Sequence, residues 1–325
     1  MPTIHDVAKH AGVTPTTVSR VLNNRGYISD KTRKKVYSSM EELNYQPNEI
    51  ARSLKNKQSN IIGLIVPDVS HPFFASFASH IEYFAYEKGM KVLLCNSHLD
   101  PVKEKEYIDM MRGNRVDGII MSSHTLEIEQ YQNVQSPIVT FDRQIGDIPF
   151  ISSDNYMGGK LATELLISKG CRKIAHICGN LQLNLLANER SKAFLDVVNV
   201  HNVDHVVIET DMNVFHTREY QQLIRELLLD HPDLDGVFAT SDIIAAYVIK
   251  ECMEMGIHVP DQIKVVGYDD VSVAPWITPS LTTIRQPIEE IGKLSIALLS
   301  QQINNEDYII KNQLDVTLIE RASTM

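Results

Sequence analysis

Residues 4–23, with the sequence IHDVAKHAGVTPTTVSRVLN, have the pattern of two short amphipathic helices joined by a tight turn. Apolar side chains recur at helical spacing in both segments: Val7, Ala8 and Ala11 in the first, and Val18, Val21 and Leu22 in the second. Gly12 lies where the first helix must end and reverse. Thr14 suits the N-cap of the second helix, and Pro15 suits its first helical position.

The polar side chains of the second segment lie off its apolar stripe and suit contacts with phosphates and base edges. These side chains are Thr16, Thr17, Ser19, Arg20 and Asn23. Such a second helix is typical of a helix-turn-helix unit, in which it enters the major groove of DNA. The opening stretch therefore predicts a DNA-binding module.

A third helix is expected over residues 31–44, with Ser29 or Asp30 as its N-cap. Three short helices would complete a headpiece at residues 1–46. Residues 47–58 hold about two turns of possible helix, which is too short to be stable alone in water. We expect this segment to be a hinge helix between the headpiece and a larger core.

The charge of the chain is divided unevenly along its length. The whole chain of 325 residues carries a net charge of −10, yet residues 1–57 hold ten basic and five acidic side chains, a net charge of +5. The remaining residues therefore carry −15. A basic module on an acidic body is expected when only one end of a protein meets a polyanion.

Other features of the sequence exclude several classes of protein. No apolar run reaches the roughly 18 residues of a membrane helix, and no signal peptide precedes the first helix. The four cysteines lack the spacing of metal ligands and are expected to be reduced thiols. We therefore expect a cytoplasmic protein without membrane contact. The sequence lacks the motifs of glycine-rich phosphate-binding loops, of nucleophile elbows and of zinc proteases. We therefore expect no enzyme, no cofactor and no metal site.

From residue 59 onward, short apolar runs alternate with helical patterns. Strands are expected at residues 61–67, 91–96, 116–121, 138–141, 174–178, 205–209, 236–239 and 264–267, with helices between them and a last helix at 288–301. Two rounds of this alternation predict an α/β core at residues 59–325, built from two doubly wound parallel-sheet subdomains. The first would take about residues 59–156 and 287–315, and the second about 157–286 and 316–325.

Polar and aromatic side chains gather where the predicted strands end. They lie in residues 68–74, 141–143, 184–190, 241–242, 267–270 and 285–286. In open α/β sheets, ligands bind beyond the carboxyl ends of the strands. Carboxylates, amides, an arginine and an aromatic face suit a polyhydroxylated ligand, because they exchange hydrogen bonds with hydroxyls and cover apolar C–H surface.

Five stretches of the chain resemble the lactose-repressor family of regulators: residues 6–23, 44–54, 116–120, 266–270 and 281–287. The resemblance covers essentially the whole chain. It implies a helix-turn-helix headpiece and a core like that of periplasmic binding proteins. Within the family, residues 95–97, 122–124, 141–143 and 152–155 look most similar to sucrose-operon repressors of Gram-positive bacteria, and ribose-operon repressors share the Asp142–Arg143 pair.

The resemblance implies two sets of site residues. Positions matching the DNA-binding side are Pro15, Thr16, Arg20, Ala51, Arg52, Leu54 and Lys55. The headpiece adds Thr3, Thr14, Thr17, Ser19, Asn23 and Tyr27 to the predicted DNA-binding set. Positions matching the effector site are Phe73, Asp142, Arg190, Phe215, Ser241, Asp269 and Gln286. The strand-end stretches add Ser70, Phe74 and Arg143 to the predicted effector site. Among them, Pro15 offers only an apolar contact to a base, and Ser241 departs from the Asn or Asp that is common in the family.

These observations predict a homodimeric repressor of a sugar-utilisation operon, bound to a pseudo-palindromic operator and released by a sugar or sugar phosphate. An alternative is a catabolite-type regulator controlled by a phosphorylated carrier protein. A sugar-binding transport protein would share the core but would need a signal peptide and no headpiece. An enzyme is the least favoured class, since no nucleophile–base pair is evident.

The match of Leu54 to a hinge leucine that wedges into the minor groove generates a prediction. Leu54→Ala should weaken binding to the specific operator much more than binding to random DNA, because only a kinked central step accepts the wedge. Fluorescence anisotropy with both DNAs at the same salt concentration measures the two losses. Equal losses on both DNAs would rule out the wedge.

Overall fold

We describe the protein from a computed structural model, which defines residues 2–46, 58–123, 125–126, 130–131, 134, 136–182, 185–210 and 217–325. The chain divides into two compact units, residues 1–59 and 60–325. Five of the predicted site residues lie outside the described residues: Ala51, Arg52, Leu54, Lys55 and Phe215.

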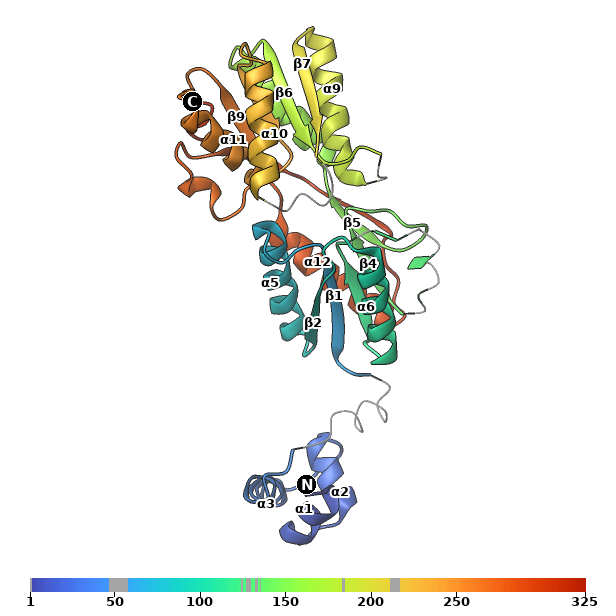
Figure 1. The fold of residues 1–325 in the computed structure, drawn as a ribbon. Helices are drawn as coiled ribbons and strands as arrows, with labels where there is room; N and C mark the ends of the chain where they lie inside the picture. The colour runs from blue at the N-terminus through green and yellow to red at the C-terminus, as the bar shows by residue number, and fades with distance from the viewer. Residues whose placement is uncertain are drawn as a thin grey trace. The chain divides into compact units, whose positions relative to one another are not determined.

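The first unit is a three-helix headpiece of α1 (Ile4–Ala11), α2 (Pro15–Leu22) and α3 (Asp30–Glu42), as Figure 1 shows. Its core consists of the predicted apolar stripes, with Val7, Val18 and Val36 fully buried. The caps at Thr14 and Ser29 are confirmed, because each hydroxyl accepts a backbone N–H from the first turn of its helix. The third helix ends at Glu42, earlier than predicted, since Asn44 has a left-handed φ of 47°.

The second unit contains two six-stranded sheets. The first sheet has the order β11-β5-β4-β3-β1-β2, and all its pairs are parallel. Its strands are β1 (Ile61–Val66), β2 (Lys91–Asn96), β3 (Gly118–Met121), β4 (Ile138–Phe141), β5 (Phe150–Ser153) and β11 (Lys311–Leu314). Helices α5 (Pro72–Glu87) and α12 (Ile288–Ile303) cover one face, and α6 (Pro101–Gly113) covers the other (Figure 1).

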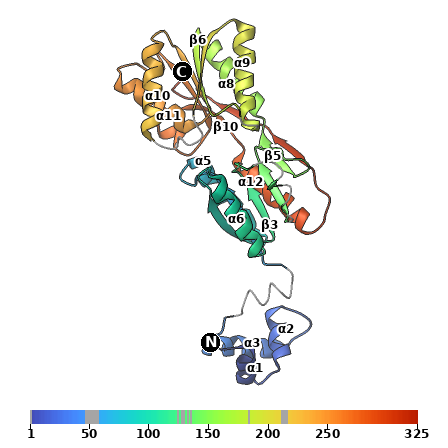
Figure 2. The same ribbon diagram turned by 45° about the vertical axis from the view of Figure 1, so that its right-hand side comes forward.

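The second sheet has the order β12-β10-β9-β8-β6-β7, with one antiparallel pair, β10 with β12. Its strands are β6 (Lys173–Cys178), β7 (Asp204–Glu209), β8 (Gly236–Ala239), β9 (Lys264–Asp269), β10 (Thr282–Arg285) and β12 (Thr317–Ile319). Helices α8 (Asn155–Ser168) and α9 (Glu189–His201) lie side by side on one face (Figure 2). Helices α10 (Thr217–Asp230) and α11 (Asp242–Glu254) cover the other.

The chain crosses between the two sheets after β5, after β10 and after β11. The sequence does not predict strands β5 and β10, because β5 ends in Ser152 and Ser153, and β10 begins with Thr282 and Thr283. Neither strand has a continuous apolar run. Their buried hydroxyls are instead satisfied by hydrogen bonds, which makes polar residues tolerable inside a sheet.

Three further observations concern the whole described part of the chain. None of its helices is both long enough and apolar enough to cross a membrane. All four cysteines are buried with free thiols. In the same residues, no cluster of three or more His, Cys, Asp or Glu side chains is arranged to hold a metal ion.

A fully buried histidine in β6 makes the stability of the core depend on pH. The ring of His176 is stacked between Phe194 and Phe238, with both centroid distances 4.7 Å. Its Nδ1–H donates to the Phe238 carbonyl at 3.1 Å, and its Nε2 accepts from the Ser191 hydroxyl at 2.8 Å. Burial lowers the pKa of His176 to about 3, so the folded protein keeps this ring neutral.

Histidine in the unfolded chain titrates near pH 6.5, so below that pH the unfolded state takes up a proton that the folded state refuses. We expect the free energy of unfolding to fall by about 1.4 kcal/mol per pH unit from this group as the pH drops from about 6.5 toward 3. In His176→Gln the side chain still has a hydrogen-bond donor and an acceptor, but it does not titrate. The free energy of unfolding of this variant should therefore lack the pH dependence that His176 causes. Urea unfolding of both proteins between pH 7 and pH 4 measures it, and parallel pH profiles would contradict the prediction.

Candidate functional site

A cavity of about 280 Å³ lies in the core, at the carboxyl ends of strands from both sheets. Its wall combines aromatic rings with a few polar groups, which is the usual composition of a small-molecule site. The lining residues are Pro67, His71, Phe73, Phe74, Leu99, Ser122, Phe141, Asp142, Leu185, Ala187, Arg190, Thr240, Ser241, Asp269 and Gln286.

Arg190, in the first turn of α9, is the central polar group of this wall. Its Nε donates to Oδ1 of Asn155 at 2.7 Å, and its Nη1 donates to the Thr240 carbonyl at 3.1 Å. Its Nη2 lies 3.6 Å from Oδ2 of Asp142, and the guanidinium stacks on the Tyr268 ring at 3.6 Å from the centroid. Since a guanidinium has five N–H donors, the described contacts leave donor capacity at both terminal nitrogens for a bound molecule.

Asn155, the first residue of α8, orients both members of the Arg190–Asp142 pair. Its Oδ1 accepts from Arg190 and from the Tyr268 hydroxyl, the latter at 3.4 Å, while its Nδ2 donates to Oδ1 of Asp142 at 3.0 Å. Asp142 follows β4 of the first sheet, and Arg190 follows β6 of the second. A single buried amide therefore connects the two halves of the cavity wall.

Two glycines bring α8 close enough for these contacts. A Cβ atom on Gly159 would lie 2.3 Å from the backbone oxygen of Arg190, and one on Gly158 would lie 2.5 Å from the Tyr268 hydroxyl. Neither neighbour can be displaced without moving Arg190 or the ring beneath it. The glycine pair therefore fixes the distance between α8 and the arginine.

The opposite part of the wall contains a second bridge between the sheets. Gln286 donates from Nε2 to Oδ1 of Asp269 at 2.7 Å and accepts from the Ser153 hydroxyl at 2.6 Å. Burial raises the pKa of Asp269 to about 7, against the attraction of Arg190. Burial also raises the pKa of Asp142, with Arg190 again opposing it. The two carboxylates thus lie in a poorly hydrated site with one shared cation.

The remaining wall offers a hydroxyl and an aromatic surface. The Ser122 hydroxyl is buried and has no hydrogen-bond partner among the described residues, so it is available to a bound molecule. Phe73 and Phe141 lie with near-parallel rings, 5.7 Å between centroids, and Phe74 packs edge-on against Phe73. This cluster suits the apolar face of a sugar ring.

The structure brings together most of the predicted effector positions: Phe73, Phe74, Asp142, Arg190, Ser241, Asp269 and Gln286 all line the cavity. Two others do not. Ser70 lines a neighbouring cavity of about 240 Å³ that shares Ser241 with this one. The guanidinium of Arg143 lies over the Tyr131 ring at 5.4 Å and donates to the Leu126 carbonyl at 3.3 Å.

Arg143 is therefore not among the residues that line this cavity, and its role in effector binding stays a prediction. Asp142 adopts a left-handed φ of 59°, so the chain turns there and the next side chain leaves the cavity. The predicted effector positions also omit Ser122, which lines the cavity, and Asn155, which holds Arg190 from outside the lining. Asn155 follows the strand β5 that the pattern does not predict, so its position at a strand end goes unrecognised.

In the headpiece, the predicted DNA-contacting residues lie mainly on α2 and at the caps. Thr16 and Arg20 of α2 are exposed, and Tyr27 is 94% exposed. Pro15, Thr17, Ser19 and Asn23 are half-buried, and Asn23 donates to the Ser19 carbonyl at 2.7 Å. Thr3 and Thr14 are both exposed N-caps, and Arg20 donates from Nε to the Arg25 carbonyl at 3.3 Å.

Comparison with known proteins finds similarity along the whole chain. Residues 3–48 match the model of bacterial regulatory proteins of the lacI family, and residues 163–324 match a periplasmic binding protein-like domain. A ribose operon repressor of Halalkalibacterium halodurans is 40% identical over 100% of this chain and 97% of its own length. A sucrose operon repressor of Pediococcus pentosaceus is 39% identical over 98% of each chain.

Two solved structures extend this similarity. A periplasmic binding protein/LacI transcriptional regulator from Alkaliphilus metalliredigens, complexed with D-xylulofuranose, is 38% identical with a TM-score of 0.76, over 82% of this chain and 99% of that one. The lac repressor dimer bound to operator and the anti-inducer ONPF is 27% identical with a TM-score of 0.88, over 100% and 99% of the two chains.

The glycine contact behind Arg190 gives a test of the packing. Gly159→Ala should lower the free energy of unfolding by about 1–3 kcal/mol, because its Cβ has no room beside the Arg190 backbone. Gly113→Ala in α6 is the matched control, since a Cβ there meets nothing within 4 Å. Urea unfolding compares the two, and equal stability of both variants would contradict the close approach.

Proposed function

Since this chain belongs to the lacI family of bacterial regulatory proteins, we propose that it represses a sugar-utilisation operon and leaves its operator when a sugar binds the core cavity. The observation that carries the proposal is the cavity wall. It combines Arg190, Asp142, Asp269 and Gln286 with an aromatic cluster, which suits vicinal hydroxyls on a ring with an apolar face.

The effector proposed is a neutral monosaccharide. The volume of about 280 Å³ is at the small end of ligand sites, which favours one sugar ring. Arg190 shares the wall with two carboxylates, and burial lowers the pKa of His71, which disfavours its charged form. A phosphate group needs unpaired cations, so this wall favours an uncharged sugar. The Alkaliphilus relative, which is complexed with a free furanose, agrees with that choice.

The bridges between the two sheets supply a route from the sugar to the DNA. Asp142, Asn155 and Arg190 form one bridge, and Ser153, Gln286 and Asp269 form the other. A sugar that hydrogen-bonds to Arg190 and Asp269 changes the energy of both. It shifts the core between two arrangements of the subdomains only to the extent that it binds one of them better.

On the DNA side, α2 is proposed to enter the major groove with Thr16 and Arg20 toward the bases and Pro15 against a thymine methyl. The hinge residues Ala51, Arg52, Leu54 and Lys55 are proposed to contact the minor groove. The remaining predicted residues are proposed to position the headpiece on the phosphates: Thr3, Thr14, Thr17, Ser19, Asn23 and Tyr27.

A homodimer is part of the proposal, because a two-fold axis matches a pseudo-palindromic operator. The first subdomain offers an apolar surface around the sheet edge formed by β2. Exposed apolar side chains there come from α5, β2 and α6: Tyr83, Tyr86, Leu94, Val102 and Met110. The related lac repressor structure is a dimer.

The test measures operator affinity while sugars are added. A fluorescent DNA fragment from the region upstream of the regulated operon is titrated with the full-length protein, alone and with D-ribose, D-fructose, D-xylulose or the phosphate of each. One neutral sugar should weaken operator binding by roughly 10–100-fold, and its phosphate should not. Arg190→Lys should lose the response to the sugar, because lysine cannot reproduce the forked contacts.

Two outcomes would overturn the proposal in different ways. A response to the phosphorylated sugars alone would contradict the neutral effector. If no sugar acts and a phosphorylated carrier protein instead raises operator affinity, the catabolite-type alternative replaces the sugar-responsive one.

A further inference from the structure

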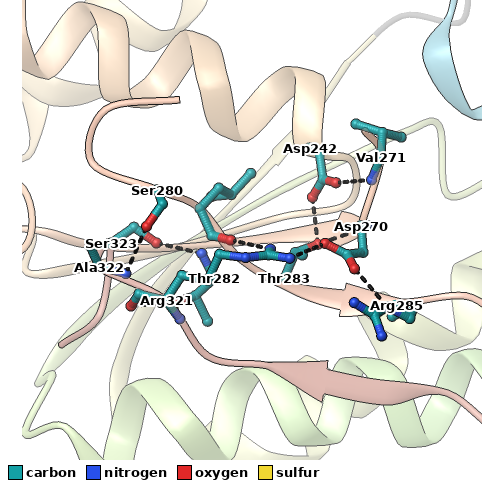
Figure 3. A network of polar contacts seen from close by, with 11 residues as sticks. Asp242, Asp270, Val271, Ser280, Thr282, Thr283, Arg285, Arg321, Ala322 and Ser323 are labelled. Atoms are coloured by element: carbon teal, nitrogen blue, oxygen red, sulfur yellow. Dashed lines mark hydrogen bonds and ion pairs between the residues drawn. The ribbon is translucent and has the colours of Figure 1, made fainter. Parts of the chain in front are cut away.

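The two aspartates at the end of β9 face different partners. Asp269 lines the cavity. The carboxylate of Asp270 instead accepts from two arginines, from Nε of Arg285 at 2.6 Å and from Nη2 of Arg321 at 2.7 Å (Figure 3). The carboxylate of Asp269 therefore faces the cavity, whereas that of Asp270 belongs to a network of ion pairs outside the cavity lining.

The backbone at this point is strained. Asp269 has a φ of 110° and Asp270 a φ of 54°, so two consecutive residues with side chains lie in the left-handed region. This conformation is unfavourable for a residue with a side chain and persists only where surrounding contacts hold it. The direction of the Asp269 carboxylate depends on this turn.

Part of the support comes from Asp242 and Thr283. Oδ2 of Asp242 accepts from the Val271 N–H at 2.8 Å, and its Oδ1 accepts from the Thr283 hydroxyl at 2.5 Å. The Asp270 N–H donates to Oγ1 of the same threonine at 3.4 Å. These bonds hold the backbone of the turn but leave the Asp270 side chain to the arginines.

The two arginines are not equivalent. The Arg321 side chain is 17% exposed, whereas that of Arg285 is 54% exposed, and the Asp270 carboxylate between them is 6% exposed. Arg321 also donates from Nη1 to the Leu281 carbonyl at 2.7 Å. Its two terminal nitrogens therefore contact the residue before β10 and the turn after β9. A half-exposed ion pair contributes little, which leaves Arg321 as the main partner of Asp270.

Arg321 itself is fixed by the segment that follows β12. Its backbone N–H donates to the Thr282 hydroxyl at 2.8 Å. The hydroxyl of Ser323 accepts from the Thr282 N–H at 2.8 Å (Figure 3). It donates to the Val265 carbonyl at 2.6 Å. Residues 321–324 are therefore attached to both β9 and β10, the strands on either side of the turn.

We propose that Arg321, which lies outside the cavity, is a positioning residue of the effector site. Through Asp270 it holds the strained turn and so keeps the Asp269 carboxylate directed into the cavity. The inference rests on the proposed function, because it takes the cavity to be the sugar site.

Arg321→Gln tests the inference, with Arg285→Gln as the matched control on the same carboxylate. Calorimetry measures the affinity of each protein for whichever of D-ribose, D-fructose or D-xylulose the unaltered chain binds. Arg321→Gln should weaken sugar binding about ten-fold or more and Arg285→Gln by less than about three-fold. Operator affinity in the absence of sugar should stay unchanged in the control Arg285→Gln, whose side chain is half-exposed.

A double-mutant cycle separates positioning from general damage. In the Asp270→Asn background the carboxylate is already lost, so adding Arg321→Gln should cause little further loss of sugar affinity. Full additivity of the two losses, or an equal effect of both arginine variants, would overturn the proposal.

Amide hydrogen exchange supplies a readout that does not require the sugar. In Arg321→Gln the amides of residues 268–273 should exchange faster, while those of β6 and β8 should not change. If the unaltered chain binds no sugar, the proposed function fails. In that case, faster exchange in Arg321→Gln would still support the stabilisation of the turn by Arg321. Unchanged exchange would contradict that stabilisation.

Discussion

The buried guanidinium of Arg190 constrains the site more than any other group. A charge removed from water must be paired and hydrogen-bonded, or its burial is strongly destabilising. Here the partners come from both halves of the core: Asp142 after β4, Asn155 at the start of α8, and the Thr240 carbonyl after β8. The requirement to satisfy one cation therefore ties the geometry of the cavity to the arrangement of the two sheets.

Several sequence features become understandable from this constraint. Gly158 and Gly159 allow α8 to approach close enough for Asn155 to reach the guanidinium. Tyr268 places its ring beneath the cation, where cation–π attraction offsets part of the lost hydration. The left-handed backbones of Asp142 and Asp269 turn two carboxylates toward the same space. A sugar in the cavity would therefore bind to side chains that are already connected by hydrogen bonds and an ion pair.

The sequence predicts those parts of the molecule that depend on regular periodicity. The apolar runs of β1 and β6 and the stripes of α1 and α2 are local signals, and the structure follows them closely. Strands β5 and β10 are not predicted from periodicity, because their buried serines and threonines depend on hydrogen bonds to residues distant in the sequence. Asn155 lies just after β5, so its place at a strand end is not predicted either. The direction of Arg143 depends on a single backbone angle at Asp142, which no pattern of residue types encodes.

In the proposed function, sugar binding in the cavity and operator binding by the headpiece are energetically linked. Linkage is reciprocal, so the most direct measurement is the Kd of the neutral sugar for the full-length protein, free and saturated with operator DNA. We expect operator DNA to weaken sugar binding by the same factor by which the sugar weakens operator binding. An identical sugar Kd in both states would contradict it.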